Sequence, residues 1–349
     1  MKTTRWLGAA LCGTLMTLAA CGGGGSDSAA STATGTTSAQ PIAGFARGAD
    51  VGWITQQEAA GQQFRDTSGA QQDPFALLHA RGIDAIRLRV WVNPADGWNG
   101  LADVLAKARR AAAQGQRIMI DFHYSDTWAD PGHQTRPAAW AGHDYAALKD
   151  DVYAHTHDVL DALRQAGIAV EWVQVGNEIN SGMLWPEGSY QNFSQLAGFI
   201  NAGYAAVKAV YPQAKVVVHL SSGSDNAMYR WFFDAVKAAG AQWDIIGLSH
   251  YPSASGWASA NAKIGSNMAD MVARYAKPVM VTEVGMDWQQ AATTKAMLSD
   301  LITRVAAQGE QGLGVFYWEP DAAPNWQGYT MGALDADGRF TAALDAFAH

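Results

Sequence analysis

The sequence predicts a (β/α)8 barrel, an α/β fold in which eight parallel strands alternate with helices around a closed sheet. The first observation is that apolar, β-branched runs alternate with helical patterns from Ile42 to the C-terminus. The second is that glycine follows several of the helical patterns, where it readily takes the left-handed helix-stop conformation. The alternative is a doubly wound open sheet. It is disfavoured because no glycine-rich phosphate loop follows the first strand, and because eight units would close.

The eight predicted strands are, in order, 46–52, 85–92, 117–124, 170–178, 215–221, 244–251, 278–284 and 313–319. The helical patterns between them include Leu101–Gln114, Asp144–Gln165, Gln195–Tyr211, Met228–Ala239 and Thr293–Gln308, and a last helix is expected at Arg339–Phe347. The glycines that end such patterns are Gly115, Gly167, Gly240 and Gly309. Eight units over roughly 300 residues fit a barrel of about 250 residues plus insertions.

The N-terminus has the pattern of an export signal. Lys2 and Arg5 precede an apolar run over residues 6–20, which suits a signal peptide and is short for a membrane span. The run ends at Cys21-Gly22 in a segment that resembles the lipobox of bacterial lipoproteins, and this resemblance implies lipidation of Cys21. The alternative is a secreted or periplasmic protein in which this cysteine occurs by chance.

The chain is therefore predicted to contain three parts. Residues 1–20 form the lipoprotein signal peptide, and residues 21–41 form the lipidated cysteine and a flexible Gly/Ser/Thr linker. Residues 42–349 form one barrel domain. We expect an exported protein held by the lipid at a membrane, and Gly22 rather than Asp after the cysteine favours the outer membrane or cell surface.

Composition excludes several other classes. The net charge is −8 without a strong basic cluster past the start of the chain, so nucleic acid is not an expected partner. Hydrophobic residues make up 48% of the chain, and both cysteines lie in or at the end of the signal, so core packing must stabilise the domain. No zinc-type spacing occurs, and the acidic turn at 335–338 has only two acids. No metal or other cofactor is expected.

Two glutamates carry the functional prediction. Glu178 and Glu283 each follow an apolar β-branched stretch, at the ends of the fourth and seventh predicted strands. A barrel places its active residues at the C-terminal ends of its strands, so the fold would bring the two together. A pair of inward carboxylates is what glycosidic bond cleavage requires. The alternative is two ordinary buried acids in salt bridges.

Polar and aromatic residues also gather at the other predicted strand ends, more densely than a structural role requires. A carbohydrate cleft would explain them together, and the 14 tryptophans suit stacking on sugar rings, although tryptophan also fills cores. These residues are Asp50, Arg87, Arg89, Trp91, Asn93, Asp121, His123, Tyr124, Ser125, Asp126, Trp128, Asn177, His219, Ser221, His250, Tyr251, Trp288, Trp318, Glu319 and Asp321.

Residues 44–347 resemble, in order, the arabinogalactan endo-β-1,4-galactanases of glycoside hydrolase family 53, a family of a retaining (β/α)8 clan. The segment from Asp121 to Gly132 (DFHYSDTWADPG) is the most specific part of this resemblance. The other matching segments are Gly48–Val51, Arg87–Trp91, Val175–Ile179, Thr282–Gly285 and Phe316–Pro320.

The resemblance implies that Glu178 is the general acid/base and Glu283 the nucleophile. Such an acid must hold a proton at neutral pH, so we expect burial and the nearby Glu283 charge to raise the pKa of Glu178. Asn177 is expected to bond the sugar 2-hydroxyl or to cap the strand end. Either Arg87 or Arg89 would keep Glu283 ionised, with Arg89 favoured by its position at the strand end. Tyr251 is expected to donate to the nucleophile.

The remaining expected substrate contacts are less specific. Trp318 is the expected stacking platform for the sugar at the cleavage site, while Trp91, Trp128 and Trp288 are placed either in further subsites or in the core. Glu319 also follows a strand and competes for the role of nucleophile, but is expected to bond substrate or support the site. The further expected contacts are Asp50, His123, Asp126 and His250.

The predicted function is a retaining endo-β-1,4-galactanase that cleaves the galactan of pectin side chains or type I arabinogalactan into short oligosaccharides. An endo-acting cleft needs no second subunit, so a monomer is expected. The nearest alternative is another endoglycanase of the clan, such as a mannanase or endoglucanase. Two more distant alternatives are a non-catalytic glycan-binding lipoprotein and a barrel enzyme for phosphate-bearing substrates. The second is disfavoured because this sequence has no glycine-rich phosphate site after the late strands.

Overall fold

The computed structural model describes residues 44–348 and contains a closed barrel of eight parallel strands. The barrel strands are β1 (Ala46–Asp50), β2 (Ala85–Val90), β3 (Arg117–Phe122), β4 (Trp172–Val175), β7 (Lys215–Leu220), β8 (Ile245–His250), β9 (Val279–Val284) and β10 (Gly312–Trp318). They follow one another around the ring in chain order, and β10 closes it by pairing with β1. The (β/α)8 fold predicted from the sequence is confirmed.

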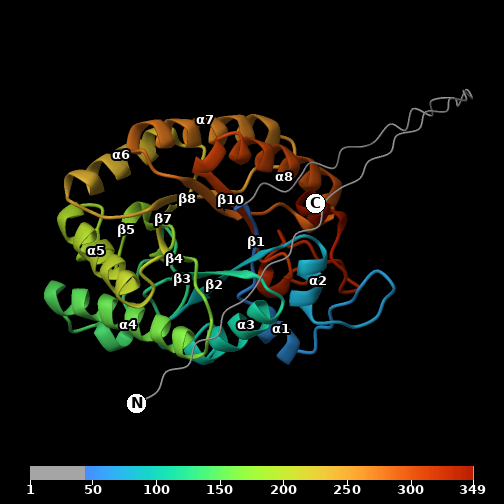
Figure 1. The fold of residues 1–349 in the computed structure, drawn as a ribbon, viewed down its shortest axis with the longest axis horizontal. Coiled ribbons are helices and arrows are strands. Elements are labelled where there is room, and N and C mark those ends of the chain that lie inside the picture. The colour runs from blue at the N-terminus through green and yellow to red at the C-terminus, as the bar shows by residue number, and fades with distance from the viewer. Residues whose placement is uncertain (1–43, 349) are drawn as a thin grey trace, which may run out of the picture. The chain divides into compact units, whose positions relative to one another are not determined.

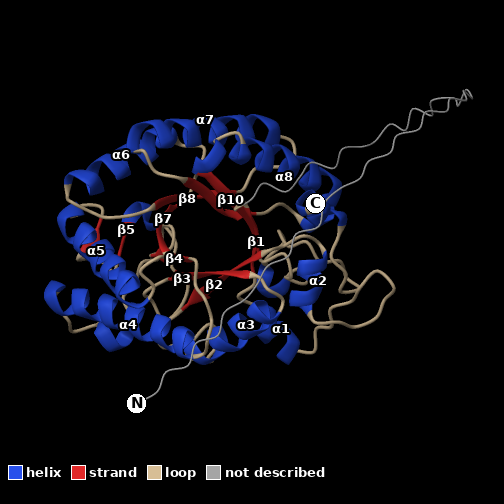
Figure 2. Cartoon of the chain, viewed as in Figure 1, coloured by secondary structure: helices blue, strands red, loops and turns tan. Residues whose placement is uncertain are grey.

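Helices surround the strand ring, as Figures 1 and 2 show. They are α1 (Ile54–Ala59), α2 (Pro74–Ala80), α3 (Leu101–Ala113), α4 (Tyr145–Gln165), α5 (Phe193–Val210), α6 (Asn226–Ala238), α7 (Trp257–Tyr275) and α8 (Ala291–Ala306). Acidic or amide side chains cap several of the N-termini: Asp144 accepts from the third residue beyond it at α4, and Asp225 does the same at α6. Each such bond satisfies a backbone N–H that the helix itself leaves unpaired.

Apolar side chains fill the barrel interior below the polar residues. Each strand contributes one residue to this cluster: Ala46, Ala85, Met119, Trp172, Val217, Ile245, Met280 and Phe316. Side chains alternate between the two faces of a strand, so the residue two positions further on points into the barrel as well. In β2, β3 and β4 those next inward positions hold Arg87, Asp121 and Gln174. The alternation thus stacks a polar layer above the apolar one, at the C-terminal ends of the strands.

A few elements differ from the sequence prediction. The last helix is a shorter 3-10 helix at Ala342–Phe347. A small antiparallel hairpin, β5 (Gly182–Met183) with β6 (Gly188–Ser189), lies in the connection after β4 and was not predicted. The predicted signal peptide, the predicted linker and Cys21 lie outside the described residues. Within residues 44–348, no helix is both long and apolar enough to cross a membrane.

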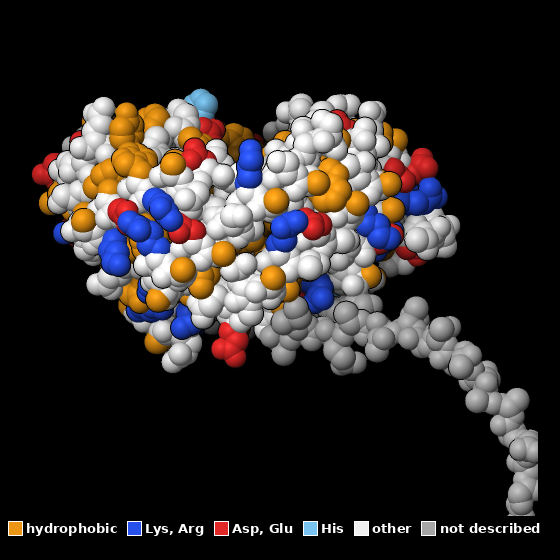
Figure 3. All heavy atoms as spheres, turned by 90° about the horizontal axis from the view of Figure 1, so that it is seen from above, with side chains coloured by type: hydrophobic (Ala, Val, Ile, Leu, Met, Phe, Trp, Pro, Cys, Tyr) orange, Lys and Arg blue, Asp and Glu red, His pale blue; other side chains and the backbone are white. Residues whose placement is uncertain are grey.

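Lysine and arginine side chains lie beside aspartate and glutamate on the face drawn in Figure 3. Among residues 44–348, exposed pairs also join neighbouring helices, for example Arg274 with Asp234 and Arg230 with Asp270 between α7 and α6. Exposed pairs of this kind contribute little to stability individually. They leave this face without a broad region of one sign, which agrees with the weak net charge.

Candidate active site

A pocket opens at the C-terminal ends of the barrel strands. Its lining comes from the loops after β3 and β4 and from the ends of β8, β9 and β10, and consists of His123, Trp128, Ala129, Asp130, Asn177, Glu178, Tyr251, Glu283 and Trp318. Most of these residues belong to the predicted site. The lining divides into polar groups, among them the two carboxylates and Asn177, and aromatic rings, among them Trp128 and Trp318. This division suits a ligand with hydroxyl groups at its edges and apolar faces.

Glu178 and Glu283 meet in this pocket. An oxygen of one carboxylate lies within 4.8 Å of an oxygen of the other. Glu178 follows β4 in a left-handed conformation with φ 46°, which is uncommon for a residue other than glycine or asparagine. Strain of this kind costs on the order of 1–3 kcal/mol and is concentrated at functional sites. Because the backbone turns here, the chain does not continue along β4, and the Glu178 side chain lines the pocket at the strand ends.

The environment of Glu178 favours its protonated form. Burial and the neighbouring Glu283 charge raise the pKa of Glu178 to about 8. No cation bonds this carboxylate among the described residues, and the hydroxyl of Ser249 is its hydrogen-bond donor, at 2.5 Å. At neutral pH Glu178 can therefore hold a proton and donate it.

Glu283 has the opposite environment. Burial raises its pKa as well, but the Arg87 guanidinium lies 3.0 Å from one carboxylate oxygen and opposes that effect. The Tyr251 hydroxyl donates to the other oxygen at 2.8 Å. Two donors stabilise the charged form, so Glu283 is the member of the pair that is ionised when Glu178 is protonated. The preference for Arg89 in this bond is corrected: Arg87 makes it.

The choice between the two arginines depends on their depth in the barrel. Arg87 lies one inward position deeper than Arg89 and reaches Asp50 at 2.7 Å and Asp121 at 2.9 Å as well as Glu283. Arg89 instead pairs with Glu319, with Asp50 at a longer 3.4 Å. Each arginine thus neutralises a different carboxylate, and removal of either would leave a buried acid unpaired.

Asn177 is held in one orientation by three donors. Arg87, Gln174 and His219 all lie 2.9–3.0 Å from its side-chain oxygen. Its amide nitrogen donates to the backbone oxygen of Ala129 at 2.8 Å. Because that nitrogen carries two hydrogens, one N–H is left to donate into the pocket. The arrangement fixes the amide as a donor toward a bound hydroxyl.

Ser249 connects Glu178 to His219. Its hydroxyl lies 2.8 Å from Nε2 of His219, and the other ring nitrogen of His219 faces the Asn177 oxygen. Burial lowers the pKa of His219 well below its usual range, so the ring is neutral and has one N–H. That hydrogen belongs on the nitrogen that faces the Asn177 acceptor, which leaves Nε2 as an acceptor. Ser249 can therefore donate either to His219 or to an ionised Glu178.

Replacing Ser249 with alanine is expected to move the alkaline limb of the pH profile of kcat/KM to higher pH. The hydroxyl donates a charge-assisted bond to the ionised carboxylate, which lowers the pKa of Glu178. Without it, the protonated acid persists to higher pH. The profile should be measured for both proteins, with Ser266→Ala, an exposed serine on α7, as control. An unshifted limb in Ser249→Ala would contradict this role.

Arg89 lies among four tryptophans. Its guanidinium carbon is 4.4 Å from the ring centre of Trp128 and 5.3–6.0 Å from those of Trp53, Trp91 and Trp318. Such cation–π contacts are stronger in a desolvated setting. Trp128 and Trp318 also line the pocket, with ring centres 5.9 Å apart. Arg89 and its partner Glu319 are fully enclosed, so their role is to support this aromatic wall rather than to contact substrate.

Some predicted substrate contacts have other roles in the structure. Trp91 is buried and donates from its ring N–H to His123, which in turn bonds Asp121. Asp126 accepts from the backbone of Asn93 and Ala138, and so holds two loops together. Trp91 and Asp126 therefore support the pocket from outside its lining.

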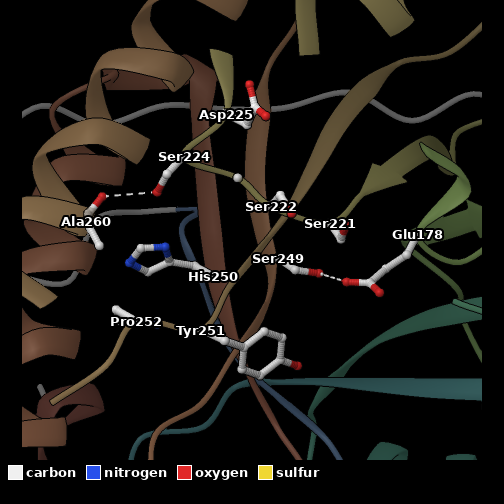
Figure 4. A pocket seen from close by; sticks show the side chains of 11 residues that line it. Glu178, Ser221, Ser222, Ser224, Asp225, Ser249, His250, Tyr251, Pro252 and Ala260 are labelled. Atoms are coloured by element: carbon white, nitrogen blue, oxygen red, sulfur yellow. Dashed lines mark hydrogen bonds between the residues drawn. The ribbon is translucent and has the colours of Figure 1, made fainter. Parts of the chain in front are cut away.

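His250, Trp288 and Asp50 also differ from expectation. His250 bonds Asn261 on α7 at 2.7 Å, and Figure 4 shows its ring turned away from Glu178. It follows Ser249 on the strand, and side chains alternate, so the inward position belongs to Ser249. Trp288 is half-buried in a 3-10 helix after β9 and is outside the pocket lining. Asp50 is enclosed and pairs with Arg87.

Ser249, Gln174 and Trp53 were not predicted as site residues. The alternation of side chains could have identified Ser249, two residues before Tyr251, and Gln174, two residues after Trp172. Trp53 lies beyond β1, at the N-terminus of α1, where no such alternation applies. A hydroxyl or amide side chain in an apolar strand is a weak indication of a site residue when its hydrogen-bond partner is not known.

Glu178, His219 and Glu283 also place ligand-type atoms within 4.8 Å of one another. Both nitrogens of His219 already have partners in Asn177 and Ser249, and Arg87 lies against Glu283. An arginine so close to the carboxylate disfavours a cation there. The cluster is better explained as an acid pair with its supporting bonds than as a metal centre.

A closed barrel that brings two carboxylates together at the C-terminal ends of its strands is typical of enzymes that hydrolyse glycosidic bonds, and the chain is a glycoside hydrolase. Comparison with known proteins gives the family. The chain belongs to glycosyl hydrolase family 53, whose family model matches residues 46–347.

Similar proteins agree with this assignment. The chain is 35% identical over 299 residues to a probable arabinogalactan endo-β-1,4-galactanase A of Neosartorya fischeri, covering 78% of this chain and 83% of the relative. It is 35% identical over 296 residues to an arabinogalactan endo-β-1,4-galactanase of Thermothelomyces thermophilus, covering 78% and 89%. A solved structure from a study of two fungal β-1,4-galactanases superimposes with a TM-score of 0.80 at 31% identity, covering 86% of this chain and 98% of that one.

Proposed function

We propose that the protein is a retaining endo-β-1,4-galactanase that hydrolyses β-1,4-galactan of pectin side chains or type I arabinogalactan to short galacto-oligosaccharides. The observation that carries the proposal is the pair of unlike carboxylates, with oxygens within 4.8 Å and a pKa of about 8 for Glu178. Retaining pairs stand about 5–5.5 Å apart, whereas inverting pairs stand about 6.5–9.5 Å apart to admit a water. The names of the relatives support galactan as the substrate.

In the first step the ionised Glu283 attacks the anomeric carbon. The bond from that carbon to the glycosidic oxygen breaks, and Glu178 gives its proton to the departing oxygen. The products are a covalent glycosyl ester on Glu283 and a shortened chain with a new hydroxyl. Arg87 and Tyr251 bond the carboxylate that loses its charge in this step. Before this step, the same two contacts keep Glu283 ionised.

In the second step Glu178, now ionised, takes a proton from water. The water oxygen attacks the anomeric carbon from the side that the leaving group vacated, and the ester bond to Glu283 breaks. Two displacements at one carbon give net retention. The pKa of Glu178 falls between the steps, because esterified Glu283 no longer carries the charge that raised it.

Asn177 and the aromatic wall would orient the sugar at the cleavage site. Asn177 lines the pocket and its amide nitrogen bonds one described acceptor, so its second N–H would bond the 2-hydroxyl as charge develops on the ring. Trp318 lines the same pocket as the two carboxylates, and its ring would stack on the sugar. His123 also lines the pocket, but both of its ring nitrogens are bonded within the protein, to Trp91 and to Asp121, so it would support the site rather than bond a hydroxyl.

The nearest alternative is hydrolysis of another β-1,4-glycan, such as mannan or cellulose, because the same two glutamates would serve. We therefore expect reducing-sugar release from linear β-1,4-galactan and little from β-mannan or carboxymethylcellulose, with the β-anomer formed first in NMR spectra. Release from mannan or cellulose instead would contradict the substrate, and an α-anomer first would contradict the two-step mechanism. Silence on all three would favour a glycan-binding protein without catalysis.

A lipid anchor at Cys21 and a location at the outer membrane or cell surface are part of the proposal. They rest on the sequence of residues 1–41 alone. A flexible tether would let the barrel reach a large polymer outside the inner membrane. A monomer would be sufficient, because the described pocket is complete within one chain.

A further inference from the structure

A second pocket adjoins the catalytic one. Glu178 and Tyr251 line both pockets, and the second continues along the loop after β7 and the end of β8, where its other lining residues are Ser221, Ser222, Gly223, Ser224, Asp225, Ser249, His250, Pro252 and Ala260. Figure 4 shows Glu178 at one end of this hollow. The loop after β7 that carries Ser221, Ser222 and Ser224, called the serine loop below, runs along its edge. Glu283 and Trp318 line only the catalytic pocket, so the second pocket extends away from the nucleophile.

An exposed pair of aromatic rings involves α6, the helix that begins directly after the loop lining this second pocket. Trp231 on α6 and Tyr190 in the loop after β6 are each 45% exposed, and their ring centres are 5.9 Å apart. Trp231 is the one tryptophan within residues 44–348 that is exposed rather than buried or half-buried. Phe193 supports it from below at 5.3 Å. Neither exposed ring has a part in the catalytic chemistry described above.

The chain connects these rings to the acid/base. Asn180 lies two residues beyond Glu178, accepts from the backbone of Ser221 at 2.9 Å and contacts the sulfur of Met228 at 3.3 Å. Trp231 lies one helical turn beyond Met228 and therefore on the same side of α6. The backbone of Tyr190 bonds Ser181, next to Asn180, at 3.0 Å. A path of contacts thus runs from Glu178, past the serine loop, to the two rings.

We propose that Tyr190 and Trp231 form a binding surface for the distal sugar units of the leaving-group part of the galactan chain. This inference rests on the proposed function, because Glu178 protonates the leaving oxygen and the departing chain must lie on its side of the cleft. The second pocket takes the first units after the cleavage point, with hydroxyl groups from its serines. The chain then emerges over α6, where the two rings pack against sugar faces.

The size and chemistry of the surface favour a sugar chain over a protein partner. Two rings of this exposure offer roughly 200 Å² of contact, since each ring can bury about 150–250 Å² in full. A stable protein interface needs about 800 Å² from each partner. The adjacent Arg230 is already paired with Asp270. Tyrosine and tryptophan combine a flat apolar face with a polar edge, which matches the two aspects of a pyranose ring.

The test compares Trp231→Ala and Tyr190→Ala with the wild type on two substrates. For long linear β-1,4-galactan, kcat/KM should fall roughly two- to tenfold through a higher KM, the size of one aromatic contact. For an aryl β-galactobioside, whose leaving group is one small ring, kcat/KM should not change. Trp231→Leu keeps the apolar contact with Phe193 and should show the same loss if the flat face matters. Tyr153→Ala removes a tyrosine of 39% exposure on α4 and should have no effect on either substrate.

Galacto-oligosaccharides labelled at the reducing end locate the effect. Loss of the surface should shift cleavage toward the labelled end, because long leaving groups lose their extra contact. An unchanged KM for long galactan, an equal loss on both substrates or an unshifted cleavage pattern would overturn the inference. If the wild type cleaves galactan and Trp231→Ala behaves identically, only this inference fails. If the wild type leaves galactan intact, the proposed function fails first.

Discussion

Replacing Glu283 with alanine is expected to abolish galactan hydrolysis, with a fall in kcat of about 10⁴-fold or more, the scale on which loss of a nucleophile acts in hydrolases. Without the carboxylate no glycosyl ester can form, and Arg87 loses its partner at 3.0 Å. Single-turnover and steady-state rates on linear galactan measure the loss. The Asp50 and Asp121 contacts of Arg87 remain, so the barrel should stay folded.

Two further variants test the assignment of Glu283 as nucleophile. Glu310→Ala removes an exposed glutamate on a 3-10 helix before β10 and should leave the rate unchanged. Glu319→Gln tests whether Glu319, the other candidate, is the nucleophile instead. Burial raises the pKa of Glu319 to about 7, and its carboxylate is taken up by Arg89 and the backbone of Trp53. Full activity in Glu283→Ala, or loss of the chemical step in a folded Glu319→Gln with Glu283 intact, would refute the assignment.

Replacing Glu178 with alanine is expected to slow hydrolysis of galactan roughly 10²–10⁴-fold, the contribution of a positioned general acid. A substrate with an activated leaving group needs little protonation, so formation of the glycosyl ester from it should remain fast. The ester should then accumulate, since Glu178 no longer activates water. Added azide should release it as a β-glycosyl azide. Steady-state rates on both substrate types, with and without azide, give the measurement.

The pH profile provides the matching control. In the wild type the alkaline limb of kcat/KM should follow Glu178, whose pKa is raised to about 8, because activity requires the protonated form. In Glu178→Ala that limb should disappear for the activated substrate, while the acid limb set by ionisation of Glu283 stays. A wild-type rate on galactan, or a preserved alkaline limb in the variant, would refute the role of Glu178.

Much of the architecture could be predicted because it depends on local patterns. Mainly apolar strands of four to seven residues and helices with one buried face recur around the barrel, and each can be recognised without its neighbours. The position of Glu178 and Glu283 at strand ends followed from the same pattern. The α1 and α2 helices and the β5–β6 hairpin were not predicted, because they have only two to seven residues each. The α7 helix was also not named, although its buried residues Ile264, Met268 and Met271 recur at helical spacing.

The sequence by itself therefore determined the barrel, the strand ends at which the two glutamates lie and the family resemblance. Only the tertiary structure decided which arginine reaches Glu283, that Ser249 rather than His250 faces Glu178, and that Trp91 supports the aromatic wall from behind. The reason is geometric. A strand fixes which residues share a face, but depth in the barrel and the partner across it depend on how eight strands are staggered around the ring. That stagger comes from packing between segments far apart in the chain, and no local pattern contains it.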